Sequence, residues 1–362
     1  MDKQASDNFF QQLDSLWIKP EIERRTLAQT LPADFKIYRC LIKMPHGKEP
    51  IVEFNDEIVL TAKFEAAPGE NIQAGNPVFL HQVKKIESVK PPEVDGVRVA
   101  FVYLYWNGNH YETIFDFTPN VPDELITPEQ KELWNFGEAI GKSIQNILSE
   151  RAINIQGNSP QLFNTIGLWA APALIPYPLT KIAVELDKGN FDVALKALIE
   201  HCNDTFLRTL IDKWYDHNIF VHRKTLIEDA FFAHQNQKYT LSINALIPQI
   251  EGVITDWMYS NVDIDDNSIP WRQESKTKKF REEILNGQIS SYSYKAIVES
   301  TLNFILDGPV LDTFKKWEQN VNTAFPNRHV VEHGKYIDDL YKIENSIRLF
   351  LLLDTISYIM NK

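Results

Sequence analysis

The spacing of apolar residues changes twice along the chain. Residues 7–31 carry apolar side chains at helical intervals, and Pro20 and Pro32 interrupt the pattern. We therefore expect an amphipathic helical segment that breaks at each proline. From Phe35 onward the apolar residues come instead in short runs of β-branched and aromatic types, separated by Pro and Gly. This change of period predicts strands.

The β-like region contains one strong local signal. Residues 97–106 and 110–117 form two apolar runs on either side of Asn107-Gly108-Asn109. Asn-Gly between such runs predicts a tight hairpin. Residues 35–42 and 57–64 read as further strands, so we expect a small β-rich domain before residue 122.

Helical spacing returns further along and continues to the end of the chain. Thr127-Pro128-Glu129-Gln130 has the residues of a helix start, and a turn at 187–190 divides the helical stretch 179–217. The last helix is expected over about 335–360, and its segment 349–353 is apolar on every side. Such a helix is buried in a bundle core or a subunit interface.

Together these patterns predict an α+β protein whose strands precede a larger helical part. The expected segments are a helical segment at 1–34, a β-rich domain at 35–122, a helical linker domain at 123–215 and a helical bundle at 216–362. The length of 362 residues fits two or three domains.

Composition narrows the classes of function. Acidic residues exceed basic ones to give a net charge of −12, which argues against a positively charged coat for non-specific nucleic-acid binding but allows a local basic cleft. Nothing in the sequence indicates DNA binding. Cys40 and Cys202 are the only cysteines, which excludes a disulfide framework and Cys-rich metal modules. The first residues lack the apolar core of a signal peptide, so we expect a cytoplasmic protein with no membrane partner.

Candidate chemistry concentrates in residues 325–334. Asn327, Arg328, His329, Glu332 and His333 lie within seven positions, just before the expected terminal helix. RNA is cleaved when its 2′-hydroxyl attacks the adjacent phosphate. That reaction needs a group that moves protons, as histidine does near neutral pH, and a fixed cation such as arginine. The segment therefore favours a ribonuclease that requires no metal and no other cofactor.

The spacing from Arg328 to His333, with polar His329 directly after Arg328, resembles the R-x4-H signature of the HEPN superfamily of helical bundles. Asn327 and the long Leu-rich helix that follows also resemble uncharacterised bacterial proteins of defence and abortive-infection type. The resemblance covers about 216–362. It implies an endoribonuclease of a defence or toxin system, with Arg328 and His333 as the catalytic pair in the cleft of a homodimer.

Helix geometry gives separate support for a dimer. Arg328 and His333 are separated by about 140° around a straight helix, so they do not point into one pocket. A second copy, or a non-helical start after Pro326, would bring them together. We therefore expect a homodimer through the C-terminal bundle, with RNA as the substrate.

Two alternatives remain open for this segment. His329 and His333 also match the H-x-x-E-H pattern of zinc hydrolases. The third ligand would have to come from the acidic residues after His333, which are Asp338, Asp339, Glu344 and Asp354. Alternatively, the Arg and His side chains cap or pair within a non-catalytic interaction module.

Supporting residues are expected outside this segment. Glu251 lies in a predicted helix, where it either is a surface residue or part of a structural ion pair, as we favour, or orients Arg328 or His333. The densest basic run is the candidate contact for the RNA backbone; it consists of Lys276, Lys278, Lys279 and Arg281. Phe101, Tyr103 and Tyr105 share one strand face, where they form either a base-stacking platform or, as we favour, a hydrophobic core.

Overall fold

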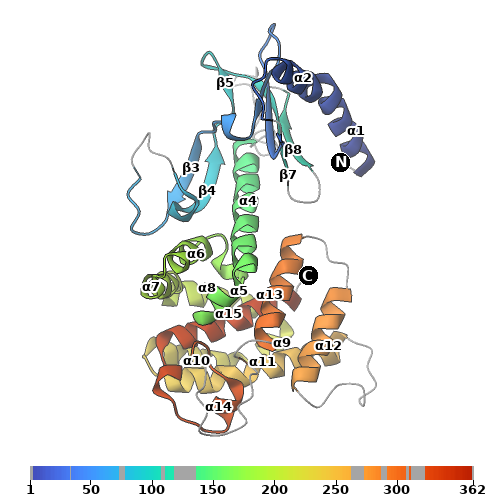
Figure 1. The fold of residues 1–362 in the computed structure, drawn as a ribbon. Coiled ribbons are helices and arrows are strands. Elements are labelled where there is room, and N and C mark those ends of the chain that lie inside the picture. The colour runs from blue at the N-terminus through green and yellow to red at the C-terminus, as the bar shows by residue number, and fades with distance from the viewer. Residues whose placement is uncertain are drawn as a thin grey trace, which may run out of the picture. The chain divides into compact units, whose positions relative to one another are not determined.

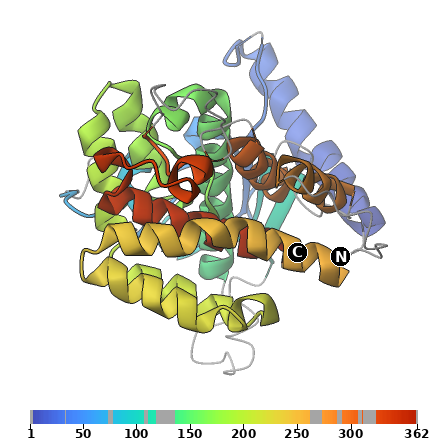
Figure 2. The ribbon, with the colours of Figure 1, turned by 90° about the horizontal axis from the view of Figure 1, so that it is seen from below.

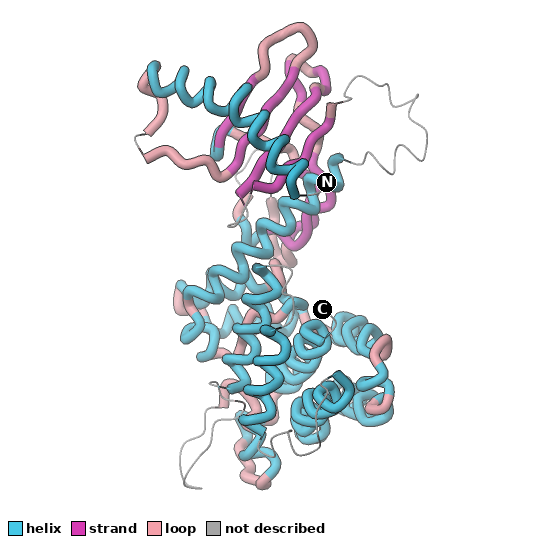
Figure 3. The backbone as a smooth tube through the Cα atoms, turned by 90° about the vertical axis from the view of Figure 1, so that its right-hand side faces the viewer, coloured by secondary structure: helices cyan, strands magenta, loops and turns pink. Residues whose placement is uncertain are grey.

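The computed structural model describes residues 3–32, 34–72, 78–106, 111–117, 136–261, 273–286, 292–306, 310 and 323–360. The chain divides into two compact units (Figure 1). The first contains residues 1–66 and 85–147, and the second contains residues 67–84 and 148–362. The described strands all lie between Arg39 and Asp116, and most of the other described residues are helical (Figure 3). This arrangement confirms the α+β class. The two units are a coarser division than the four expected segments, whose boundaries stay predictions.

The first unit begins with three consecutive helical elements, α1 (Lys3–Leu13), the π-helical turn η1 (Asp14–Ile18) and α2 (Lys19–Leu27). The break expected at Pro20 is wrong. Pro20 occupies the first turn of α2, where the N–H that proline lacks has no partner within the helix. The helical run therefore passes through it and ends before Pro32.

The strands of this unit are short, and the main sheet is antiparallel with the order β2-β1-β7-β8. The strands and 3₁₀ turns are β1 (Arg39–Met44), β2 (Ile51–Phe54), η2 (Asn55–Glu57), β3 (Ala62–Ala66), η3 (Leu80–Gln82), β4 (Val83–Val89), β5 (Glu93–Val94), β6 (Val97–Arg98), β7 (Ala100–Trp106) and β8 (Tyr111–Asp116). Trp106 lies opposite Tyr111, which confirms the expected strand pairing, although the turn at 107–110 is outside the described residues. The run 57–64 forms a strand only from Ala62.

Alternation along the strands gives this sheet two apolar faces. Cys40, Ile42 and Leu104 pack with Leu13 and Ile18 of the N-terminal helical elements. Residues of the opposite face pack with β4 and with Ile144 and Ile147 of α4 (Phe136–Asn158); this face includes Phe101, Tyr103 and Tyr105. These three aromatic side chains are buried, so they form core and do not offer a stacking platform.

The second unit is built from helices, and its main segment begins at Leu148, within α4. They are α5 (Pro160–Thr165), η5 (Pro172–Leu174), α6 (Leu179–Asp187), α7 (Phe191–His201), α8 (Asp204–Trp214), α9 (Asn218–Val221), α10 (Lys224–Gln235), α11 (Tyr239–Asn261), α12 (Gln273–Asn286), α13 (Tyr292–Leu306), α14 (Arg328–Glu332), η7 (Asp338–Leu340) and α15 (Ile343–Met360). The antiparallel pair α10 and α11 lies side by side in Figure 2. The helix start expected at 127–130 is outside the described residues.

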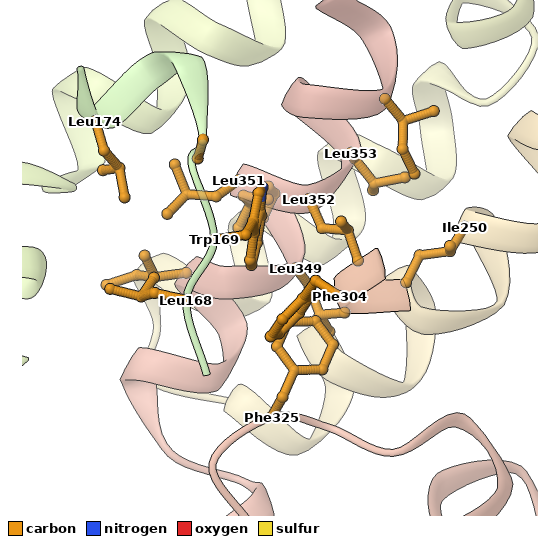
Figure 4. Packing of buried hydrophobic residues seen from close by; sticks show 14 of the residues in the cluster. Leu168, Trp169, Leu174, Ile250, Phe304, Phe325, Leu349, Leu351, Leu352 and Leu353 are labelled. Atoms are coloured by element: carbon orange, nitrogen blue, oxygen red, sulfur yellow. The ribbon is translucent and has the colours of Figure 1, made fainter. Parts of the chain in front are cut away.

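A single hydrophobic core runs through this unit, with α15 at its centre. Leu349, Leu351, Leu352 and Leu353 are fully buried on different sides of α15, and helices α7, α8, α11 and α13 cover it (Figure 4). The apolar segment 349–353 is therefore a bundle core. It does not by itself require a subunit interface.

The terminal helix begins at Ile343, not near residue 335 as expected. Gly334 adopts a left-handed conformation with φ of 72°, which ends α14. Asn345, buried in the first turn of α15, donates to the carbonyl groups of Thr323, Asp339 and Leu340. These bonds hold residues 323–342, which we call the strap and which include α14 and η7, against α15.

Candidate functional site

The strap presents the candidate catalytic segment as one short helix. The side chain of Asn327 caps α14 by accepting a hydrogen bond from the Val330 N–H at 3.1 Å. The Arg328 N–H donates to the carbonyl of Val310 at 3.0 Å. Asn327 thus has a structural task, since it sets where the helix begins and which way the Arg328 side chain leaves it.

Arg328 is held by two carboxylates. Its Nη2 lies 2.7 Å from Oε2 of Glu251, on α11, and 3.1 Å from Oε2 of Glu332, one helical turn further on. The Arg328 side chain is 21% exposed. Glu251 therefore forms an ion pair with Arg328, as either a structural carboxylate or one that orients this arginine would.

Glu251 also joins the basic run to the site. Lys276 Nζ lies 2.8 Å from Glu251 Oε1, and the Lys276 side chain is 13% exposed. The run lies on helix α12, where Lys278 is exposed and Lys279 and Arg281 are partly exposed. One carboxylate therefore brings together Lys276 and Arg328, two candidates far apart in the sequence.

Arg223 lies beside Gly252, the residue that follows Glu251 in α11. Arg223 forms an ion pair with Asp256 at 2.6 Å, and its guanidinium passes beside Gly252. A Cβ atom at Gly252 would lie 2.8 Å from Arg223 Nη2, so the glycine leaves room for the arginine.

The two histidines lie on a common face of the short helix. The rings of His329 and His333 are nearly parallel, with centroids 6.2 Å apart. Partial burial lowers the pKa of His329, and the neighbouring Arg328 and His333 lower it further. His333 is exposed. Because the helix turns about 140° over five residues, a single chain directs Arg328 towards α11 and His333 elsewhere.

A metal centre at this segment would need a third ligand beside His329 and His333. Within the described part of the chain, no three His, Cys, Asp or Glu side chains gather as metal ligands would. Asp339 instead forms an ion pair with Lys342 at 2.6 Å. Asp354 accepts a hydrogen bond from Trp214 at 3.0 Å. Among the described residues, no acidic side chain thus lies beside His329 and His333 as a third ligand.

A second polar cluster resembles the Ser, His and Asp side chains of a nucleophilic active site, but it is buried. His234 Nδ1 lies 2.8 Å from the Ser346 hydroxyl, Ser242 lies 2.9 Å from the same oxygen, and Asp204 lies 3.8 Å from His234 Nε2. Ser346 and Ser242 are fully buried, and burial lowers the pKa of His234. A nucleophile must reach its substrate, so this cluster joins α10, α11 and α15 structurally.

Comparisons of this chain with protein-family models, with curated proteins and with solved structures found no match. None of the described helices combines the length and apolarity needed to cross a membrane.

Proposed function

We propose that the helical unit is a metal-independent endoribonuclease of a defence or toxin-type system, in which Arg328 and His333 act on RNA. The observation that carries the proposal is the fixed Arg328 guanidinium at the start of a helix whose end presents the exposed His333. The resemblance of this segment to the HEPN signature agrees with it.

The chemistry follows from what each group can do. His333 takes a proton from the 2′-hydroxyl or gives one to the leaving 5′-oxygen, because its side chain is accessible. The two ion pairs that Arg328 makes with described residues use Nη2, which leaves Nη1 to bind a phosphate oxygen as negative charge develops. Lys278, exposed on α12, is suited to contact the RNA backbone.

The separation of Arg328 and His333 on α14 supports a homodimer as part of the proposal. In a two-fold symmetric dimer, His333 of one protomer can face Arg328 of the other, which completes a site that one chain leaves divided. We expect the dimer because of this divided site and not because of α15, which is already buried within its own unit.

One observation favours a second candidate, a non-catalytic interaction module. Arg328 is 21% exposed and satisfies two carboxylates, as a purely structural arginine would. In that case the strap and α11 form a rigid surface for a partner protein, and RNA is left intact.

The test is RNA cleavage by the full chain and two histidine variants. His333→Ala should lower the cleavage rate at least ~100-fold, since general acid–base catalysis contributes that much or more. His222→Ala, a matched change at an exposed histidine outside the site, should cleave normally.

The products should carry 2′,3′-cyclic phosphates, and activity should survive a chelator because 2′-hydroxyl attack needs no metal. Equal cleavage by His333→Ala and the wild type refutes the assignment. No cleavage by any of the three proteins favours the interaction module. Activity that is lost to the chelator and restored by zinc favours the zinc hydrolase.

A further inference from the structure

The helical unit contains a polar cavity formed by other elements than the Arg328 site. It has a volume of about 410 Å³ and lies among the last turns of α4, helix α5 and one face of α13. Trp169 and Phe304 are among its lining residues, and their ring centroids lie 4.8 Å apart in the hydrophobic core (Figure 4). A cavity of this size suits a small organic molecule.

Gln156, at the end of α4, gives the cavity a directed hydrogen-bond donor. Its side chain lines the cavity although the residue is only 4% exposed. The Ala170 N–H donates to the Ser300 hydroxyl, which therefore turns its own proton to Gln156 Oε1. These two hydrogen bonds fix the orientation of the Gln156 amide. They leave its Nε2, which has no hydrogen-bond partner among the described residues, for a ligand.

The remaining lining selects the kind of ligand. Amide groups predominate on the walls; they belong to Asn154, Asn158, Asn164 and Asn303. Among the described lining residues, Glu299 alone carries a charge. Side-chain amides pair with the edges of nucleobases, and a carboxylate without a lining cation disfavours phosphate.

We propose that this cavity binds a free nucleoside, with Gln156 Nε2 donating to a carbonyl oxygen or ring nitrogen of the base. The amides of Asn158, Asn164 and Asn303 take up the polar edge of the base. The lack of a cation among the described lining residues makes the nucleoside a better ligand than its nucleotide. The site does not depend on Arg328 or on the proposed ribonuclease activity.

Calorimetric titration of the full chain tests the proposal, using adenosine, guanosine, cytidine and uridine, their 5′-monophosphates, and glucose as a neutral sugar. At least one nucleoside should bind saturably and more tightly than its monophosphate. Gln156→Glu keeps the acceptor for Ser300 but removes the donor, and should weaken binding about tenfold or more.

Gln161→Glu is the matched control, because it makes the same charge change at an exposed position of α5 that does not line the cavity. If Gln156→Glu fails to fold, Asn303→Trp at an exposed lining position should block binding by filling the cavity.

Three results would each overturn the proposal: no nucleoside binds, glucose or the monophosphate binds as tightly as the nucleoside, or the Gln156→Glu and Gln161→Glu variants bind equally.

Discussion

Replacing Gly167 by alanine should destabilise the helical unit far more than the same replacement at Gly189. Both glycines have positive φ, 61° and 76° respectively, so both variants force alanine into a left-handed conformation that costs about 1–2 kcal/mol. The two sites differ in what the added methyl group meets.

At Gly189 a Cβ atom would have no neighbour within 4 Å among the described residues. At Gly167 it would lie 2.0 Å from the carbonyl oxygen of Ala324 and 2.8 Å from its carbonyl carbon. These distances are far inside the ~3.5 Å of a favourable non-bonded contact. Since the atoms belong to backbone, the strap must move away, which adds about 1–3 kcal/mol of overpacking. We expect a total of about 2–5 kcal/mol at Gly167 and about 1–2 kcal/mol at Gly189.

Urea unfolding followed by far-UV circular dichroism measures this difference, because a shared backbone penalty cancels between the two variants. Since the strap carries α14, Gly167→Ala should also raise amide hydrogen exchange in residues 323–342, and Gly189→Ala should not. Equal loss of unfolding free energy in the two variants would refute the close approach of Ala324 to Gly167.

Three further predictions concern charged groups and assembly. Burial raises the pKa of Asp354 to about 6, so the folded chain binds this proton more tightly than the unfolded chain. The protein therefore loses stability as pH rises from about 4 to 6. Asp354→Asn should recover at most about 3 kcal/mol of unfolding free energy in urea at pH 7 and almost nothing at pH 4. Glu251→Gln leaves Lys276 and Arg328 without their shared carboxylate and should cost about 1–2 kcal/mol in thermal unfolding, whereas Glu200→Gln, in an exposed pair, should cost less than about 0.5 kcal/mol. Light scattering at micromolar concentration should give twice the chain mass of 41.9 kDa, and a strict monomer would remove the shared site.

Local patterns in the sequence were sufficient for the elements whose residues interact mainly with near neighbours. The alternating runs that became β7 and β8 identify their pairing, because hairpin strands meet across a short connection. The turn at 187–190 separates α6 from α7 as expected. The apolar segment 349–353 could only be buried, and it is.

The limits of the helices within the strap depend on tertiary contacts, which the spacing of apolar residues in the sequence does not reveal. Residues 335–342 have no sharp break in the sequence, yet their backbone carbonyls bind Asn345 and η7 replaces the expected helix. Pro20 illustrates the converse, since a residue that usually ends a helix sits in the first turn of α2 after a π-helical turn. In the strap, tertiary contacts outweigh local preference, whereas Pro20 occupies a position in the first turn that proline tolerates.

The candidate site also combines features that the sequence predicts with features that only the tertiary structure shows. The residue types and spacing of Arg328 and His333 are visible in the chain and predict chemistry. The meeting of Arg328, Lys276 and Glu251 is not visible there, because these residues come from three helices and lie up to 77 positions apart. Whether the apolar α15 is covered by its own chain or by a second copy was also open in the sequence. Periodicity shows that a face must be buried, but only the packing of α7, α8, α11 and α13 around α15 decides what buries it.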